Sequence, residues 1–288
     1  MFEATPRPYL VPFSGGFEIT KAPTSPPETA PDEATLKESL EESVDRLDEH
    51  QRRLYADDHW SVLLVFQAMD AAGKDSTIRA VLRGVNPTGC QVMTFKQPSS
   101  RELDHDFLWR VASRVPERGR IGVFNRSHYE EVLVVRVHPE YLEGQRLPLD
   151  VPLEQRWTQR YESIVNFEQH LARNGCMVLK FFLNVSREEQ AERFRSRIDR
   201  PSKNWKFSKG DLDEREHWDE YMTAYQDALN ATSRPWAPWF AIPADDKDFM
   251  RAQVAMIVEQ SMASLELEYP KISDEKRLEL QALRATIR

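Results

Sequence analysis

The sequence predicts an α/β fold in which a parallel sheet lies between two layers of helices. Two apolar runs of strand length, residues 61–67 (SVLLVFQ) and 177–185 (MVLKFFLNV), show little alternation of polar and apolar side chains. Continuous apolar runs of this kind are typical of strands that are buried on both faces. Segments with the apolar spacing of helices separate these runs along the chain. Strands that alternate with helices predict a parallel sheet flanked by helices.

The length and composition fit a single globular unit with an N-terminal extension. The chain has 288 residues, of which 40% are hydrophobic and 10% aromatic, and this is enough for one large α/β domain with a substantial core. Residues 1–32 hold seven of the eighteen prolines, so we expect them to form an extended arm. Residues 33–288 are predicted to form one domain.

The other secondary-structure elements follow from local periodicity. Residues 33–57 carry apolar side chains at helical spacing and predict an amphipathic helix. The further helices are predicted at 74–84, 101–115, 127–136, 153–174, 187–198, 211–230, 246–266 and 273–287. The further strands are predicted at 91–95, 121–125 and 239–243.

Charge and cysteine content argue against several classes of protein. The formal charge of −8 is unfavourable for a general nucleic-acid binder. Cys90 and Cys176 form no CxxC pair, which indicates reduced thiols in the cytoplasm. The chain has no run of about 18 apolar residues and no signal-peptide pattern at its start. We therefore expect a cytoplasmic protein that binds neither nucleic acids nor membranes.

The strongest local motif is residues 68–75 (AMDAAGKD), which lie between a predicted buried strand and a predicted helix. In that context small residues direct backbone N–H groups toward an anion, and Lys74 adds a full positive charge. The residues expected to contact phosphate are Ala71, Ala72, Gly73, Asp75 and Ser76. The match to GxxxxGK(S/T) is imperfect, because Ala68 replaces the first glycine and Asp75 the hydroxyl residue. An ordinary strand–helix turn is therefore the alternative.

Two carboxylates in this motif predict a metal ion. Asp70 and Asp75 would repel phosphates unless a cation lay between them, and oxygen ligands suit Mg²⁺, with Mn²⁺ as a second possibility. Asp70 is the preferred ligand. Asp75 has an alternative role at the helix N-terminus, where a carboxylate is favourable in any case.

A second group of polar residues follows other predicted strands. In open parallel sheets ligands bind at the carboxyl ends of strands, and Lys96, Asn125 and Arg126 occupy such positions. Arg126 could bind a phosphate in bidentate fashion, or it could form only a surface salt bridge with Glu130. Asn125 stands where many phosphate-loop enzymes have a metal-binding Asp, which gives Asp70 the larger metal role.

A basic segment near residue 200 predicts a mobile lid. Its cations are Arg193, Arg195, Arg197, Arg200, Lys203, Lys206 and Lys209. They continue past Pro201 into a predicted loop and are interleaved with Trp205 and Phe207. A lid around residues 193–215 that closes over phosphates needs this composition, although a solvated helix face is the simpler interpretation.

Several motifs together resemble the polyphosphate kinase type 2 family. They are MDAAGKDSTI, GVNPTGCQVMTFKQPS, HDFLWR, GVFNRSHYEEVLVVRVHPE and WKFSKGD, followed by Pro235-Trp236, and the resemblance covers roughly residues 35–265. It implies a thymidylate-kinase-like phosphate-loop (P-loop) fold with a helical lid, Mg²⁺ as cofactor and inorganic polyphosphate as donor. It also implies a homo-dimer or homo-tetramer.

The resemblance assigns roles to individual residues. Asp70 and Lys74 match the Walker-A aspartate and lysine, and they form the expected catalytic group together with Arg126. Asn125 and Arg126 occupy the places of an Asp-Arg pair, and Glu130 stands where diphosphate-restricted members often have Asn. With Lys96, Asn125 and Glu130 are the expected acceptor-binding residues. Polyphosphate carries about one charge per phosphate, so a donor channel needs several cations. The candidates for it are Lys74, Arg126, Arg136, Arg193, Lys203 and Lys206.

The implied activity is the reversible transfer of phosphoryl groups from polyphosphate to AMP and ADP, as in the third class of the family. An ATP-dependent nucleotide kinase on the same fold is the main alternative. A GTPase-like switch protein would need an NKxD-like motif, which residues 245–248 (DDKD) do not supply. A non-catalytic polyphosphate-binding module would keep the cations but would tolerate the loss of Asp70.

Overall fold

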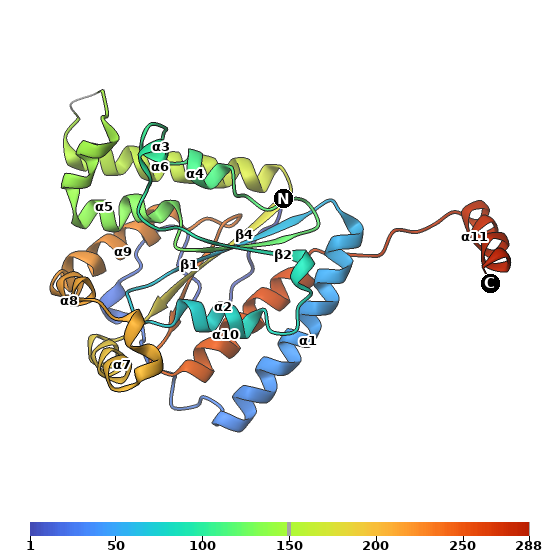
Figure 1. The fold of residues 1–288 in the computed structure, drawn as a ribbon, viewed down its shortest axis with the longest axis horizontal. Coiled ribbons are helices and arrows are strands. Elements are labelled where there is room, and N and C mark those ends of the chain that lie inside the picture. The colour runs from blue at the N-terminus through green and yellow to red at the C-terminus, as the bar shows by residue number, and fades with distance from the viewer. Residues whose placement is uncertain (149–150, 288) are drawn as a thin grey trace.

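The computed structural model describes residues 1–148 and 151–287. These residues form a five-stranded parallel sheet in the order β2-β3-β1-β4-β5. The strands are β1 (Ser61–Gln67), β2 (Cys90–Thr94), β3 (Ile121–Asn125), β4 (Cys176–Asn184) and β5 (Trp239–Pro243). The sheet lies between two layers of helices, so the predicted three-layer α/β fold is confirmed (Figure 1).

Burial explains why the strands could be located from sequence. Every residue of β1, β3, β4 and β5 is buried, whereas β2 lies at an edge of the sheet and is partly exposed. Strands covered on both faces contain little besides apolar residues. Lys180, in the middle of β4, is an exception, with a fully buried side chain.

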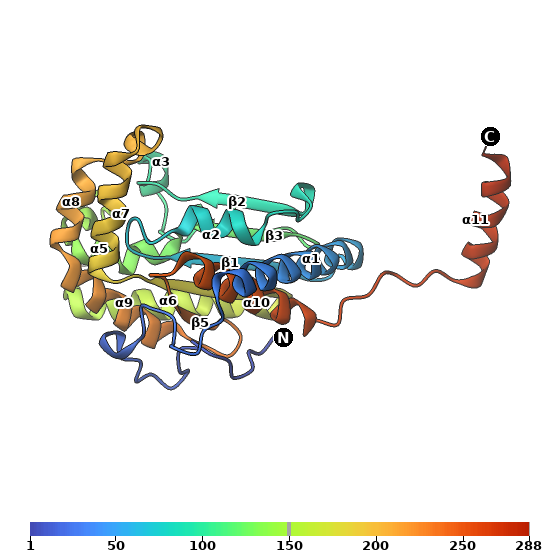
Figure 2. The same cartoon turned by 90° about the horizontal axis from the view of Figure 1, so that it is seen from below.

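Two groups of helices cover the two faces of the sheet. One group is α1 (Glu33–Asp57), α2 (Lys74–Val81) and α10 (Lys247–Ala263). The other is α5 (Val134–Val137), α6 (Leu153–Arg173) and α9 (Trp218–Thr232). Helix α1 begins after Asp32 because the Asp32 carboxylate accepts a hydrogen bond from the Thr35 N–H (2.8 Å). Figure 2 shows the same layers from below.

Three predicted helices are interrupted. Residues 101–115 form only α3 (Ser100–Leu103) and α4 (Trp109–Ala112). The Asp106 carboxylate accepts a hydrogen bond from the Leu108 N–H (2.9 Å), and this local turn competes with a continuous helix. Residues 127–136 form the 3-10 helix η3 (His128–Val132) and α5, and residues 211–230 divide between α8 (Lys209–Glu216) and α9.

The predicted lid segment forms α7 (Arg187–Asp199), the 3-10 helix η5 (Pro201–Lys206) and α8. Figure 1 places α7 and α8 together at one end of the molecule. The remaining elements are the short 3-10 helices η1 (Ile19–Lys21), η2 (Pro87–Gly89) and η4 (Pro139–Gln145), and α11 (Asp274–Thr286). Helix α11 stands away from the rest of the chain, with none of its described side chains buried (Figure 1).

The N-terminal arm packs against the free edge of β5. The Val11 N–H donates to the Trp239 carbonyl (2.9 Å), and the Ala241 N–H donates to the Tyr9 carbonyl (2.9 Å). These bonds satisfy backbone groups that an exposed edge strand would leave unpaired. Within residues 1–148 and 151–287, no helix has the length and hydrophobicity that crossing a bilayer requires.

Candidate active site

The loop between β1 and α2 is a tight turn that presents the start of a helix. Ala71 and Gly73 have positive φ angles of 62° and 113°, and a Cβ atom at residue 73 would lie 3.1 Å from Cε of Met250. Glycine therefore suits this position both conformationally and sterically. The first turn of α2 has N–H groups without intrahelical partners, which makes it suitable for binding an anion.

A cleft of roughly 850 Å³ opens over this loop. Its walls come from the P-loop, the carboxyl ends of β2 and β3, the lid segment and the start of α10. The predicted site residues that line it are Asp70, Ala71, Gly73, Lys74, Asp75, Ser76, Lys96, Asn125, Arg126, Arg193 and Lys203. Parallel-sheet topology brings them together, because β3 is the immediate neighbour of β1 and β2 lies next to β3.

Lys74 lines this cleft. Its Nζ donates hydrogen bonds to the carbonyl oxygens of Ala68 (2.5 Å) and Met69 (3.4 Å). Burial, assisted by the charge of Arg126, lowers the pKa of Lys74 to about 8. A phosphate group beside Nζ would favour the ammonium form and raise that pKa. The lysine is therefore well placed to interact with phosphate.

Arg126 joins the end of β3 to the P-loop. Its Nη2 lies 2.9 Å from Oδ1 of Asp70, and its Nη1 lies 3.7 Å from Oε2 of Glu130. The charge of Glu130, together with that of Asp70, raises the pKa of Arg126 despite partial burial. Burial raises the pKa of Glu130, although Arg126 and Lys74 oppose this shift. Arg126 thus makes the salt bridge with Glu130 and also lines the cleft.

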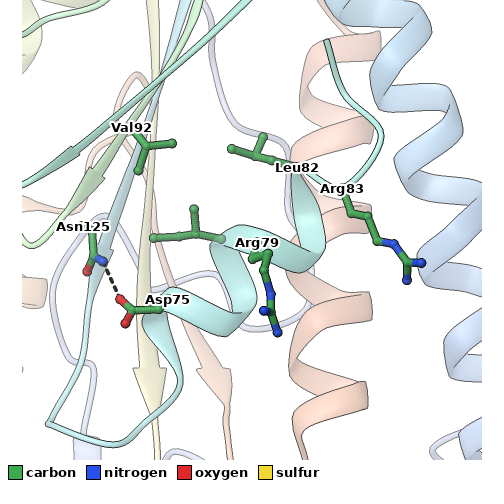
Figure 3. Close-up of a pocket in the computed structure, with 7 residues that line it drawn as sticks. Asp75, Arg79, Leu82, Arg83, Val92 and Asn125 are labelled. Atoms are coloured by element: carbon green, nitrogen blue, oxygen red, sulfur yellow. Dashed lines mark hydrogen bonds between the residues drawn. The ribbon is translucent and has the colours of Figure 1, made fainter. Parts of the chain in front are cut away.

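Asn125 makes a direct contact with the first turn of α2. Its Nδ2 donates to Oδ1 of Asp75 at 2.7 Å (Figure 3). Both residues also border a shallower groove between α2 and β2, whose other lining residues are Ile78, Arg79, Leu82, Arg83 and Val92 (Figure 3). The amide at position 125 therefore holds the Asp75 carboxylate in a fixed orientation beside the cleft.

Asp70 and Asp75 both line the cleft, and their carboxylates are oxygen donors of the kind that could hold a Mg²⁺ ion. Magnesium is usually held by one or two carboxylates together with substrate phosphates and water. Among the described residues, no group of three or more His, Cys, Asp or Glu side chains could form an all-protein metal cage. The available donors thus match a metal that arrives with its phosphate ligand.

Arg193 is more enclosed than the sequence suggested. Its side chain is 6% exposed, and its guanidinium donates to the carbonyls of Ala72 (2.6 Å), Ala244 (2.6 Å) and Asp245 (3.0 Å). Its Nε also donates to Glu189 (2.8 Å). In this arrangement Arg193 fastens α7 to the P-loop, and a contact with the donor stays a prediction.

Four predicted residues are not among those that line the cleft. Arg136 lies at a separate surface cavity, where it binds Tyr161 (2.6 Å) and Asp227 (2.5 Å), because the short helix α5 directs it toward α6 and α9. This geometry does not support its predicted contact with polyphosphate. Ala72 is fully buried behind the loop, and Glu130 reaches the site through Arg126. The Lys206 side chain lies outside the described residues.

Sequence reasoning placed Arg197, Trp205 and Asp211 within the predicted lid without naming them as site residues, and it missed Lys247; all four line the cleft. Lys247 begins α10 just after β5, so the rule that ligands bind at strand ends could have identified it. Burial lowers the pKa of Lys247, and the nearby cations Arg193, Arg251 and Lys203 add to the effect. The side of the cleft formed by the lid and α10 thus carries four cations, Arg193, Arg197, Lys203 and Lys247, together with Glu189, Glu192 and Asp211.

The site as a whole can bind a chain of phosphates and stabilise a phosphoryl group in transfer. It combines helix N–H groups, a lysine, an arginine and carboxylates that could hold a metal ion, and phosphoryl transfer depends chiefly on such positioning and charge neutralisation.

Comparison with known proteins agrees with this chemistry. A model of the polyphosphate kinase 2 family matches residues 31–270. A Rhodopseudomonas palustris protein named ADP-polyphosphate phosphotransferase is 53% identical over 248 residues, which cover 86% of each chain. An AMP/ADP-polyphosphate phosphotransferase of Meiothermus ruber is 41% identical, and the match covers 92% of this chain and 96% of that protein. The crystal structure of polyphosphate kinase 2 from Arthrobacter aurescens superimposes with a TM-score of 0.83 at 37% identity, covering 92% and 93% of the two chains.

Proposed function

The chain belongs to the polyphosphate kinase 2 family, and from this premise we propose that it transfers phosphoryl groups reversibly between inorganic polyphosphate and the adenine nucleotides AMP and ADP. The observation that carries the proposal is the cleft that Lys74, Arg126 and the lid cation Lys203 line together. The activities for which the R. palustris and M. ruber relatives are named support the donor and both acceptors.

The reaction is an in-line displacement at the terminal phosphorus of polyphosphate. An oxygen of the acceptor's last phosphate forms a new P–O bond, while the anhydride bond to the rest of the polyphosphate breaks. The bonding electron pair leaves with the shortened chain, so ADP yields ATP, and AMP yields ADP. The acceptor oxygen attacks directly and is already ionised at neutral pH, so the mechanism needs no protein nucleophile.

The residues of the cleft have separate tasks in this reaction. Lys74 and the N–H groups at the start of α2 neutralise charge on the transferred phosphoryl group. Arg126 orients the acceptor phosphate, and its salt bridge to Asp70 (2.9 Å) sets the direction of its guanidinium. Asp70, with Asp75 beside it, would hold a Mg²⁺ ion that screens the phosphate charges.

We assign the cations on the lid side of the cleft to binding the part of the polyphosphate chain that is not transferred. Replacing Lys203 and Lys247 by glutamine should raise the KM for polyphosphate about tenfold while the KM for nucleotide changes little, because polyphosphate carries a charge on every unit. Steady-state kinetics at low and high salt measure the effect, which should shrink as salt screens the charges. Lys276→Gln on the distant helix α11 is the control. Equal rises in both KM values would contradict a donor-side role.

We assign Glu130 a role in the choice between AMP and ADP as acceptor. AMP has one phosphate fewer than ADP and leaves space in front of the donor, which a carboxylate beside Arg126 can fill through water or hydrated Mg²⁺. Glu130→Asn should therefore lower kcat/KM for AMP about tenfold more than for ADP. Measuring both acceptors at saturating polyphosphate tests this. An unchanged ratio would leave Glu130 as only a structural partner of Arg126, from which it lies 3.7 Å.

Donor identity separates this proposal from an ATP-dependent nucleotide kinase with the same loop. The purified protein is supplied with Mg²⁺, AMP and either polyphosphate or ATP, and the ADP formed in each reaction is measured. We expect efficient turnover with polyphosphate. If ADP forms with ATP as the donor but not with polyphosphate, the protein is an ATP-dependent nucleotide kinase instead.

We also propose that the active form is a homo-dimer or homo-tetramer that works in the cytoplasm. The free thiols of Cys90 and Cys176 are compatible with that compartment. Sedimentation at several protein concentrations measures the size of the assembly, and a species of one chain at all concentrations would contradict the oligomer.

A further inference from the structure

A buried ionic network lies beneath the turn that carries Arg126 and Glu130. At its centre, the Nζ of Lys180 in β4 donates to Oε2 of Glu168 (2.5 Å), to the Tyr129 hydroxyl (2.9 Å) and to the Thr232 carbonyl (2.9 Å). An ammonium group has three N–H donors, and all three are used. The side chains of Lys180 and Glu168 are 0% and 1% exposed.

Tyr129 connects this ion pair to the turn. Its hydroxyl lies 2.8 Å from Oε1 of Glu168 and 3.0 Å from Oγ1 of Thr232. Its ring packs edge-on against Trp239, with the ring centres 4.7 Å apart. The neighbouring His128 places Nε2 3.3 Å from the same Glu168 oxygen. Contacts from β4, α6 and the end of α9 therefore fix the position of one tyrosine.

The turn contains two partly exposed residues, Arg126, which lines the cleft, and its partner Glu130, with buried residues between them. Arg126 and Glu130 keep 38% and 25% of their side chains exposed, whereas His128 and Tyr129 are buried. Arg126 has a positive φ of 62°, an uncommon conformation for a non-glycine residue that the surroundings must maintain. The Tyr129 N–H donates to Oγ of Ser127 (3.2 Å). A shift of Tyr129 would thus displace Arg126 and Glu130.

Stability alone does not account for an ion pair in this place. Removing charges from water is costly, and well-packed apolar residues often replace a buried ion pair without loss of stability. Burial lowers the pKa of Lys180 to about 8, even with Glu168 alongside. The charged pair contributes directional hydrogen bonds, and these bonds specify where the tyrosine hydroxyl must lie.

We propose that Tyr129, held by Lys180 and Glu168, is a positioning residue that sets the orientation of Arg126 and Glu130 toward the acceptor nucleotide. The inference rests on the proposed function for the identity of the acceptor. It assigns Tyr129 no contact with substrate. Tyr129, Glu168 and Lys180 do not line the cleft, whose donor side is built from the lid and α10.

Two variants test the proposal through the binding of ADP, measured by calorimetry. Tyr129→Phe removes only the hydroxyl and should weaken ADP binding about tenfold, while polyphosphate binding changes less than about twofold. The paired change Lys180→Met with Glu168→Leu removes both charges together and should weaken ADP binding similarly in the folded protein, because the tyrosine hydroxyl loses both ionic partners. Tyr161→Phe is the matched control, because it deletes a hydroxyl bound to Arg136 (2.6 Å) outside the cleft.

The outcomes separate this inference from the proposed function. If the folded Tyr129→Phe protein binds ADP as tightly as the wild type, or if both ligands weaken equally, Tyr129 does not position the acceptor side. A wild type that binds ADP but transfers nothing from polyphosphate would refute the proposed function, and the ADP affinities would still decide the role of Tyr129. In an active enzyme, kcat for Tyr129→Phe should fall about 10- to 100-fold at saturating substrates.

Discussion

Replacing Lys74 by alanine should lower kcat by about two to four orders of magnitude, as the loss of other transition-state charge partners does. Lys74 lines the cleft, and its ammonium is held by the carbonyl oxygens of Ala68 and Met69. Negative charge shifts among the phosphate oxygens during transfer, and Lys74 is the cation that the P-loop itself contributes. Water that replaced its side chain would have to reorient during the reaction, whereas the lysine is already in place.

The appropriate control for Lys74 is a change of equal size outside the site. Lys37→Ala removes an exposed lysine of α1, paired with Glu33, and should leave kcat within about twofold, as surface substitutions usually do. Stopped-time assays of ADP formation from AMP and polyphosphate, together with thermal melting, distinguish catalysis from stability. Near-normal turnover in a folded Lys74→Ala enzyme would show that the loop does not bind the transferred phosphoryl group.

Replacing Asp70 by asparagine should lower kcat by about two to three orders of magnitude at ordinary Mg²⁺ concentrations. Asparagine can still accept the hydrogen bond that Arg126 donates to Oδ1 of Asp70 (2.9 Å). The substitution therefore removes charge and metal affinity more than geometry. We expect half-saturation by Mg²⁺ to move to a higher concentration, with a melting temperature close to that of the wild type.

A Mg²⁺ titration of activity separates the metal role of Asp70 from a structural one. Asp211→Asn removes a carboxylate from the lid side of the same cleft and should leave half-saturation by Mg²⁺ unchanged. An Asp70→Asn protein that melts early but titrates normally would make Asp70 a structural partner of Arg126.

The predictability of the fold follows from burial. Strands β1, β3 and β5 begin and end where the apolar runs predicted, because both faces of these strands are covered. Helices with one solvated face were harder to delimit. The turn at Asp106 divides the predicted helix 101–115 through a bond from the Leu108 N–H to a carboxylate, and helical spacing alone does not reveal such a competing bond.

The candidate site could be predicted where it depends on strand ends. Lys74, Lys96 and Arg126 follow three neighbouring strands, so the topology of a parallel sheet suffices to bring them together. Arg136 lies one turn beyond η3 and points to another surface. Its direction depends on how α5 packs against α9, which the local sequence does not encode.

Interior polar contacts lay beyond the reach of sequence patterns. Arg193 belongs to a basic run, and only the packed structure shows it donating to the carbonyls of Ala72 and Ala244. Lys180 interrupts an apolar strand, yet its partners Glu168 and Tyr129 come from distant segments. Residues far apart in sequence meet through tertiary packing, and no spacing rule along the chain identifies them.

The transfer of label from polyphosphate to nucleotide tests the central claim most directly. The purified protein is incubated with Mg²⁺, uniformly radiolabelled polyphosphate and unlabelled ADP or AMP, and the nucleotides are separated. We predict that label enters ATP at its terminal phosphate when ADP is the acceptor, and enters ADP when AMP is the acceptor. The wild-type protein should do so without added ATP, and Lys74→Ala should not. If the nucleotides remain unlabelled and the polyphosphate remains intact, the proposed function is contradicted.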